Sequence, residues 1–127
     1  MSQIIRAIPV LSSSDVKRDM QWWQEKAGFK SRMSKDEYQN EWPMYAIMQR
    51  GDIFIHLQWH SGTESDPIHA SSIRIQVDQI GSIFQEFVDR GTVADNNLRT
   101  DTPWGTHEFG FYDLNNNAIH ILSLIHI

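Results

Sequence analysis

Apolar and polar residues alternate over several short stretches of the chain, which predicts β-strands that each bury one face. Pro9 places the first of them at a sheet edge or near a strand end, because proline cannot donate a ladder hydrogen bond. Arg50 and Gly51 separate two of the stretches and predict a tight hairpin. The expected strands are residues 4–11, 44–49, 52–60, 72–77 and 107–112, a final strand containing 117–122, and an extra one near 30–36.

A spacing of three to four residues replaces the alternation in two longer stretches, which predicts one helix in each half of the chain. Asp15 supplies a capping oxygen before the first helix, and Gly28 is placed to end it in the left-handed conformation. Asp78 and Gly91 hold the same places around the second helix. The apolar stripes are Val16, Met20, Trp23 and Ala27, and then Ile80, Ile83, Phe84, Phe87 and Val88.

The two halves repeat the same order of elements. Three pairs of residues keep one offset: Asp15 and Asp78 at 63 residues, Gly28 and Gly91 at 63, and His56 and His120 at 64. A constant offset indicates an internal duplication. We therefore predict an α+β fold of two tandem β-α-β-β-β modules, one at about residues 1–62 and one at about 70–127, within a single domain over residues 1–127.

Each module is expected to cover one sheet face with its helix and to leave the other face open. The strand GDIFIHLQWH places Phe54, His56 and Gln58 on one face and the aliphatic residues between them on the other. The later stretch NAIHIL does the same with His120. If the aliphatic faces pack on the helices, both histidines line a cavity.

Composition narrows the classes of function. The chain has 127 residues, 40% of them hydrophobic and 21% charged, which is typical of a soluble globular protein of one domain. It has no cysteine, no apolar run long enough for a membrane span, and no secretory signal pattern, so a cytoplasmic location without membrane contact is expected. A formal net charge of −5 disfavours nucleic acid and favours a cationic or neutral ligand.

The duplicated pattern resembles the vicinal oxygen chelate superfamily, which includes glyoxalase I, extradiol dioxygenases and bleomycin-resistance proteins. The likeness is greatest to the last group, in the stretches AIPVLSSSDVKRDMQWWQEKAGF, IMQRGDIFIHLQWHSG and PWGTHEFGFYDLNNNAIHIL. It implies a homodimer in which modules of two chains complete a cupped mixed sheet with two clefts. In the bleomycin-resistance branch, the cleft sequesters a bulky cationic antibiotic and performs no chemistry.

The resemblance also identifies the places where metal-dependent members carry their four ligands. In this chain those places hold Ile8, His56, Ser72 and His120. Ile8 has no donor atom and a neutral Ser72 hydroxyl is a poor ligand for a divalent ion, so no metal and no other cofactor are expected. Two other interpretations of the histidines stay open: cavity walls that contact a ligand, and hydrogen-bonded core residues without a ligand role.

The expected binding residues are mainly aromatic. Trp104 lies in a Pro-Trp-Gly turn where no core requires it, and flat rings stack on planar heterocycles and attract cations. Nothing in the sequence predicts a nucleophile or another catalytic residue. The candidate ligand-binding set is Trp104, His56, His120, Phe54, Gln58, Trp42, Trp59, Glu108 and Phe109.

These patterns lead to one functional hypothesis and two alternatives. The first is a binding protein, not an enzyme, that sequesters a bulky aromatic or cationic antibiotic of the bleomycin type and so confers drug resistance. The second is a metal-dependent lyase, isomerase or transferase of the glyoxalase type with a degenerate metal site. The third is a cleft that holds a metabolite of other specificity. The sequence does not identify the ligand.

Overall fold

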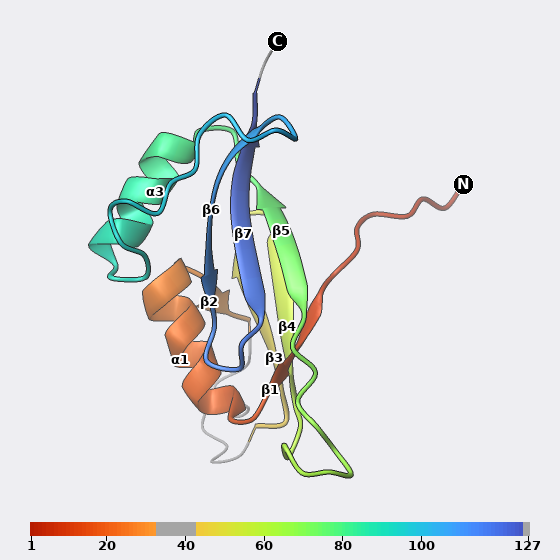
Figure 1. Ribbon diagram of the computed structural model, residues 1–127. Helices are drawn as coiled ribbons and strands as arrows, with labels where there is room; N and C mark the ends of the chain where they lie inside the picture. The colour runs from red at the N-terminus through yellow and green to blue at the C-terminus, as the bar shows by residue number, and fades with distance from the viewer. Residues whose placement is uncertain (33–42, 126–127) are drawn as a thin grey trace.

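The computed structural model describes residues 1–32 and 43–125, and it contains two small sheets with one helix each (Figure 1). The elements of the first half are β1 (Val10–Ser13), α1 (Val16–Ala27), β2 (Lys30–Ser31), β3 (Tyr45–Arg50) and β4 (Ile53–Trp59). Those of the second half are β5 (Ser72–Gln76), α3 (Ile80–Asp89), β6 (Thr106–Tyr112) and β7 (Ala118–Leu124). The predicted α+β class is confirmed.

Both sheets are mixed and follow the same plan. The first has the order β1-β4-β3-β2, with β1 parallel to β4 and the other pairs antiparallel. The second has the order β5-β7-β6, with β5 parallel to β7. Val10 pairs with His56 in one sheet and Arg74 pairs with His120 in the other, so both histidines sit at equivalent register positions.

One apolar core joins the helix-facing sides of both sheets. The strand residues Ile55 and Leu57 are fully buried under α1, while Ile119 and Ile121 lie with Phe109 beside Phe84 and Phe87 of α3. Both helices lie on the same side of the two sheets (Figure 1). The strand faces are therefore as the alternation in the sequence predicted: the aliphatic residues face the helices, and His56 and His120 face away from them.

The two helices begin differently, although the duplication predicts an aspartate cap for each. The Asp15 carboxylate accepts a hydrogen bond from the Arg18 backbone N–H at 3.0 Å, which is the capping arrangement. At α3 the cap position is Gln79, whose side chain makes no cap hydrogen bond, so the predicted role of Asp78 is wrong. At the other ends, Gly28 and Gly91 both have positive φ, as expected.

This difference predicts unequal costs of substitution. Asp15→Ala should lower the free energy of unfolding by about 1 kcal/mol, because an orphan N–H of the first turn loses its acceptor. Asp78→Ala should change it by less than about 0.5 kcal/mol, as for a surface site without such a contact. Urea unfolding of both variants measures the two values. Equal losses would contradict the assigned caps.

Three expectations about strands require correction. The first strand begins at Val10, not at residue 4, and the N-terminal end projects away from the body of the chain (Figure 1). The β3–β4 turn is Gly51-Asp52, because Arg50 pairs with Ile53. In the second half, the strand that should precede β6 is reduced to an isolated bridge between Arg99 and Glu108. Most of the extra strand expected near 30–36 lies outside the described residues, apart from the short β2.

Candidate functional site

The open face of the first sheet carries the residues that the alternation predicted. His56 stands between Val10 and Ile47 in the register, and its Nδ1 lies 2.7 Å from the Tyr45 hydroxyl. The two rings also meet edge to face, with centroids 5.3 Å apart. Phe54 and Gln58 lie on the same face, opposite Gln49 and Tyr45 respectively. The Tyr45 contact orients the His56 ring and leaves its Nε2 edge available to a ligand.

A hollow of about 530 Å³ lies over this face. Its lining combines apolar residues and His56 with two arginines, Arg6 and Arg32. The Arg6 guanidinium lies 4.7 Å from the centre of the Phe54 ring, and Arg32 donates to the Gln49 side chain at 2.6 Å. A guanidinium is planar and stacks on flat rings. The face is thus built to hold planar groups.

The open face of the second sheet is organised around Glu108, which is only 4% exposed. One of its oxygens, Oε2, accepts hydrogen bonds from Arg74 at 2.7 Å, Thr106 at 2.8 Å and the Trp104 indole at 3.2 Å. Burial alone would raise the pKa of Glu108, but these hydrogen bonds and the Arg74 charge outweigh it and lower that pKa to about 2. Glu108 is therefore a fixed negative charge at neutral pH.

Trp104 is held in place by Glu108 and yet remains 54% exposed. The Arg99 guanidinium lies 5.3 Å from the centre of its ring. The indole N–H is tied to a buried carboxylate, so the ring has a fixed orientation while much of its surface faces solvent. Such a ring offers a stacking surface with little conformational entropy to lose.

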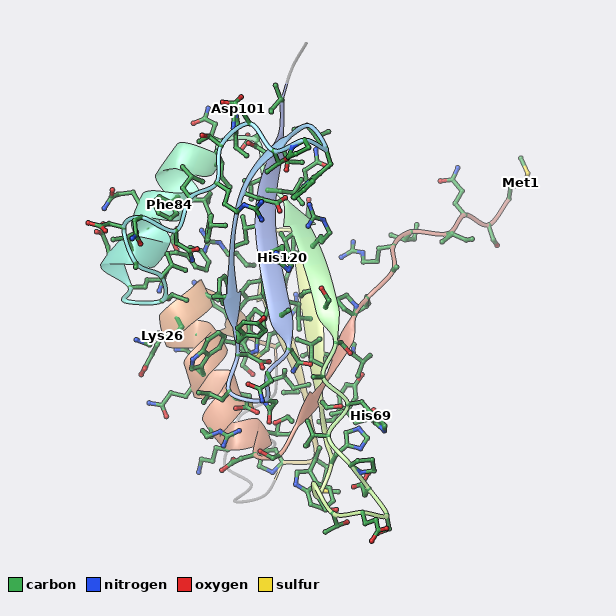
Figure 2. The ribbon with its side chains drawn as sticks, viewed as in Figure 1. Met1, Lys26, His69, Phe84, Asp101 and His120 are labelled. Atoms are coloured by element: carbon green, nitrogen blue, oxygen red, sulfur yellow. The ribbon has the colours of Figure 1, made fainter. Side chains whose placement is uncertain are left out.

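His120 lies midway along β7 (Figure 2), beside a hollow of about 220 Å³ whose lining includes Arg99 and Glu108. Its register partner is Gly110, and a β-carbon at that position would come within 3.0 Å of the imidazole Nδ1. The glycine therefore makes room for the imidazole ring over β6. Together, His120 and the Glu108 cluster form the second half of the candidate site.

Three other predicted binding residues are not placed on the open sheet faces by the structure. Trp59 lies at the end of β4 beside a separate hollow of about 390 Å³ and packs in part on the core. Phe109 is buried on the helix-facing side of β6, between Phe84 and Phe87. Trp42 lies outside the described residues.

A metal centre was one of the open alternatives. Within residues 1–32 and 43–125, no group of three His, Asp or Glu side chains is close enough to hold a metal ion. Ile8 and Ser72 occupy the remaining two predicted ligand positions.

Over the same described residues, neither α1 nor α3 has the length and apolar character needed to cross a membrane.

Known proteins resemble this chain over almost its whole length. A family model of the Glyoxalase/Bleomycin resistance protein/Dioxygenase superfamily matches residues 7–121. The chain belongs to this superfamily. The resemblance proposed from the sequence is confirmed.

Within the superfamily, the curated relatives are bleomycin resistance proteins. The one from Geobacillus stearothermophilus is 23% identical, and the match covers 96% of this chain and 98% of that protein. The bleomycin-binding protein of Streptomyces verticillus, solved with copper(II)-bleomycin, matches with a TM-score of 0.71, 20% identity and full coverage of both chains. A glyoxalase-related enzyme from Clostridium phytofermentans has the same TM-score at 16% identity, covering 97% of this chain and 98% of that one.

Several residues of the site could not be found by sequence reasoning. Arg74 and Arg99 each reach the Glu108 cluster from another segment of the chain, and Tyr45 reaches His56 from the neighbouring strand. Only Tyr45 had a usable signal, because the hairpin register places it on the His56 face. The contact between Arg74 and Glu108 depends on the parallel β5–β7 pairing, which no local pattern reveals.

Proposed function

We propose that this member of the superfamily is a binding protein that sequesters a bulky small molecule with planar aromatic or cationic parts, of the bleomycin type, and thereby confers resistance to it. The observation that carries the proposal is the oriented, half-exposed Trp104, held against a buried carboxylate at the edge of an open sheet face. Its surroundings supply stacking surfaces, which suit a ligand with flat rings and cationic groups.

The chemistry of the two open faces supports binding rather than turnover. His56, Trp104 and His120 offer ring faces and hydrogen-bonding edges, and Glu108 is committed to three donors. A carboxylate with a pKa near 2 is a poor general base at neutral pH, because it holds a proton too weakly. The bleomycin resistance relatives, which the chain matches over nearly their full length, point to the same role.

The proposal includes a homodimer in the cytoplasm. Within the described residues, β1 of the first sheet and β5 of the second are edge strands, and each has one side that pairs with no other strand. The projecting N-terminal segment exposes 97% of Ile4, which is costly for an isolated chain and typical of a surface covered by a partner. Two chains joined in this way bring an open face of one module opposite that of another.

A tryptophan-fluorescence titration with metal-free bleomycin, in the presence of a chelator, tests the proposed function. We expect a saturable change at about one ligand per chain. Trp104→Ala should weaken binding about tenfold, since stacking and cation–π contacts together contribute on the order of 1–2 kcal/mol. Trp22→Phe is the matched control, because Trp22 packs against Phe111 on the helix-facing side and should leave binding unchanged.

Three results would count against the proposal. A flat titration would remove bleomycin-type compounds as the ligand. A stoichiometric divalent ion that survives dialysis, and that is lost in His56→Ala or His120→Ala, would favour the metal-dependent glyoxalase-type enzyme. A ligand of unrelated chemistry that binds more tightly than bleomycin in a screen would favour the metabolite-binding alternative.

A further inference from the structure

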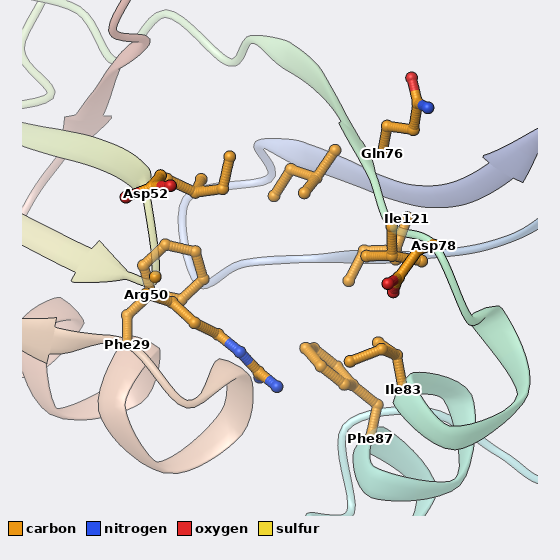
Figure 3. A pocket seen from close by; sticks show the side chains of 12 residues that line it. Phe29, Arg50, Asp52, Gln76, Asp78, Ile83, Phe87 and Ile121 are labelled. Atoms are coloured by element: carbon orange, nitrogen blue, oxygen red, sulfur yellow. The ribbon is translucent and has the colours of Figure 1, made fainter.

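A second pocket lies between the two modules, away from the open faces that carry His56 and His120. Its volume is about 660 Å³, within the range of sites that hold small molecules. One wall comes from the β3–β4 hairpin and from Phe29, just after α1, and the other comes from β5, the two residues after it, α3 and β7 (Figure 3). Boundaries between structural units are common places for ligand pockets.

The walls of this inter-module pocket are mostly apolar. Phe29 and Ile53 line the first wall, and Ile53 is 41% exposed although it is a large aliphatic residue. The second wall consists of Ile75, Val77, Ile83, Phe87 and Ile121. Two phenylalanine side chains, one from each module, border the space (Figure 3). A ligand with a ring system would bury apolar surface on both sides.

The one cation in the lining is already neutralised. The Arg50 guanidinium forms a two-pronged ion pair with Glu86, at 2.6 and 2.8 Å, and donates to the Ala27 carbonyl at 2.9 Å. The pKa of Glu86 is lowered, first by the hydrogen bond from Arg50, so this pair stays ionised and closed at neutral pH. Arg50 therefore braces the two modules and has little positive charge left for a ligand.

Two carboxylates in the lining have no such partner. Asp52 belongs to the hairpin and Asp78 follows β5, so each module contributes one (Figure 3). Throughout the described part of the chain, no side-chain hydrogen bond or ion pair engages either carboxylate, and Arg6 contacts only the backbone carbonyl of Asp52. The pocket thus combines an apolar interior with two free negative charges.

We propose that the inter-module pocket binds an apolar aromatic amine, with its ring system between Phe29 and Phe87 and its ammonium group near the carboxylate of Asp52 or Asp78. The shape of the lining favours a flat apolar body. The charge pattern favours a cation over an anion, because the only positive group present is satisfied within the protein. This site is separate from the open faces and does not depend on the proposed sequestration there.

Dansylcadaverine, a naphthalene carrying a primary amine, is a suitable probe, and the naphthalene sulfonate ANS is its anionic counterpart. We expect a saturable rise in dansyl fluorescence with the full chain, and at least tenfold weaker binding of ANS. Ile53→Trp should abolish amine binding by filling the space. Asp52→Asn combined with Asp78→Asn should weaken it about tenfold, because the pocket loses both charges that attract the ammonium group, and exposed ion pairs are individually weak.

The matched control is Asp95→Asn, which removes an exposed carboxylate remote from the pocket lining and should change nothing. Equal binding of the amine and ANS would overturn the proposal, as would loss of amine binding in His56→Ala with retention in Ile53→Trp. Amine binding that occurs only after deletion of residues 1–7 would also overturn it, and would identify the N-terminal segment as the occupant. Bleomycin binding should be unchanged in Ile53→Trp, which separates this test from that of the proposed function.

Discussion

Replacing Asn117 with alanine should lower the free energy of unfolding by about 3 kcal/mol. The Asn117 side chain is fully buried, and its amide donates to the Ser12 carbonyl at 3.2 Å and to Asp113 at 2.8 Å. Its side-chain oxygen accepts from the Ser71 backbone N–H at 2.9 Å. Alanine would leave the buried Ser12 carbonyl and the buried Asp113 carboxylate without this donor, and each such group costs about 1–3 kcal/mol.

The position of Asn117 explains why the loss should be large. Asn117 directly precedes β7, but its side chain bonds to Ser12 in β1 of the other module and to Ser71, the residue before β5. These bonds fix how the two modules join. Asn116→Gly is the control. Asn116 is exposed and has a φ of 64°, which glycine adopts without strain, so that variant should lose less than about 0.5 kcal/mol. Urea unfolding of both variants gives the comparison, and equal losses would contradict the assigned role.

Glu108→Gln should destabilise the protein by about 2–3 kcal/mol at pH 7. The folded-state pKa of about 2 lies well below the ordinary value of 4.5, and each unit of that difference corresponds to about 1.4 kcal/mol. Arg74 is about half exposed, so solvent screens part of its charge and keeps the effect at or below this range. Glutamine keeps the size of the side chain but loses the charge that Arg74, Thr106 and Trp104 satisfy.

The pH dependence of this loss has a definite sign. Because the pKa of Glu108 is depressed on folding, its contribution is fully present above about pH 4.5 and is lost as the pH falls towards 2. The stability difference between the wild type and Glu108→Gln should therefore shrink over that interval. Denaturant unfolding at several pH values measures it, with Glu64→Gln, an exposed loop substitution, as the control. A difference that stays constant down to pH 3 would contradict the assigned network.

The regular parts of the fold were predictable because local physics decides them. The stripe from Val16 to Ala27, the Asp15 cap and the left-handed Gly28 define α1 without help from the rest of the chain. The alternation around His56 and His120 likewise predicts which side chains leave the core. These signals depend on periodicity, on capping and on one residue type that tolerates positive φ.

The errors arose where distant residues decide the outcome. Residues 4–9 alternate like a strand, but Pro9 has no N–H to donate to the ladder and the paired register with β4 begins at Val10, so the first strand starts late. Asp78 matches Asp15 in position, yet α3 begins after Gln79. The Glu108 network needs Arg74 to arrive from β5, 34 residues away along the chain, and a single sequence contains no local trace of that contact. The sequence therefore predicts which side chains lie on the open sheet faces more readily than it predicts the contacts that orient them.

Equilibrium dialysis of the purified protein against metal-free bleomycin, followed by mass analysis of the recovered compound, tests the central claim most directly. Sequestration predicts retention of about one bleomycin per chain, its release on denaturation and an unchanged mass. A retained compound with an altered mass would show turnover and contradict a pure binding role. No retention at ligand concentrations well above those of the protein would contradict bleomycin sequestration itself.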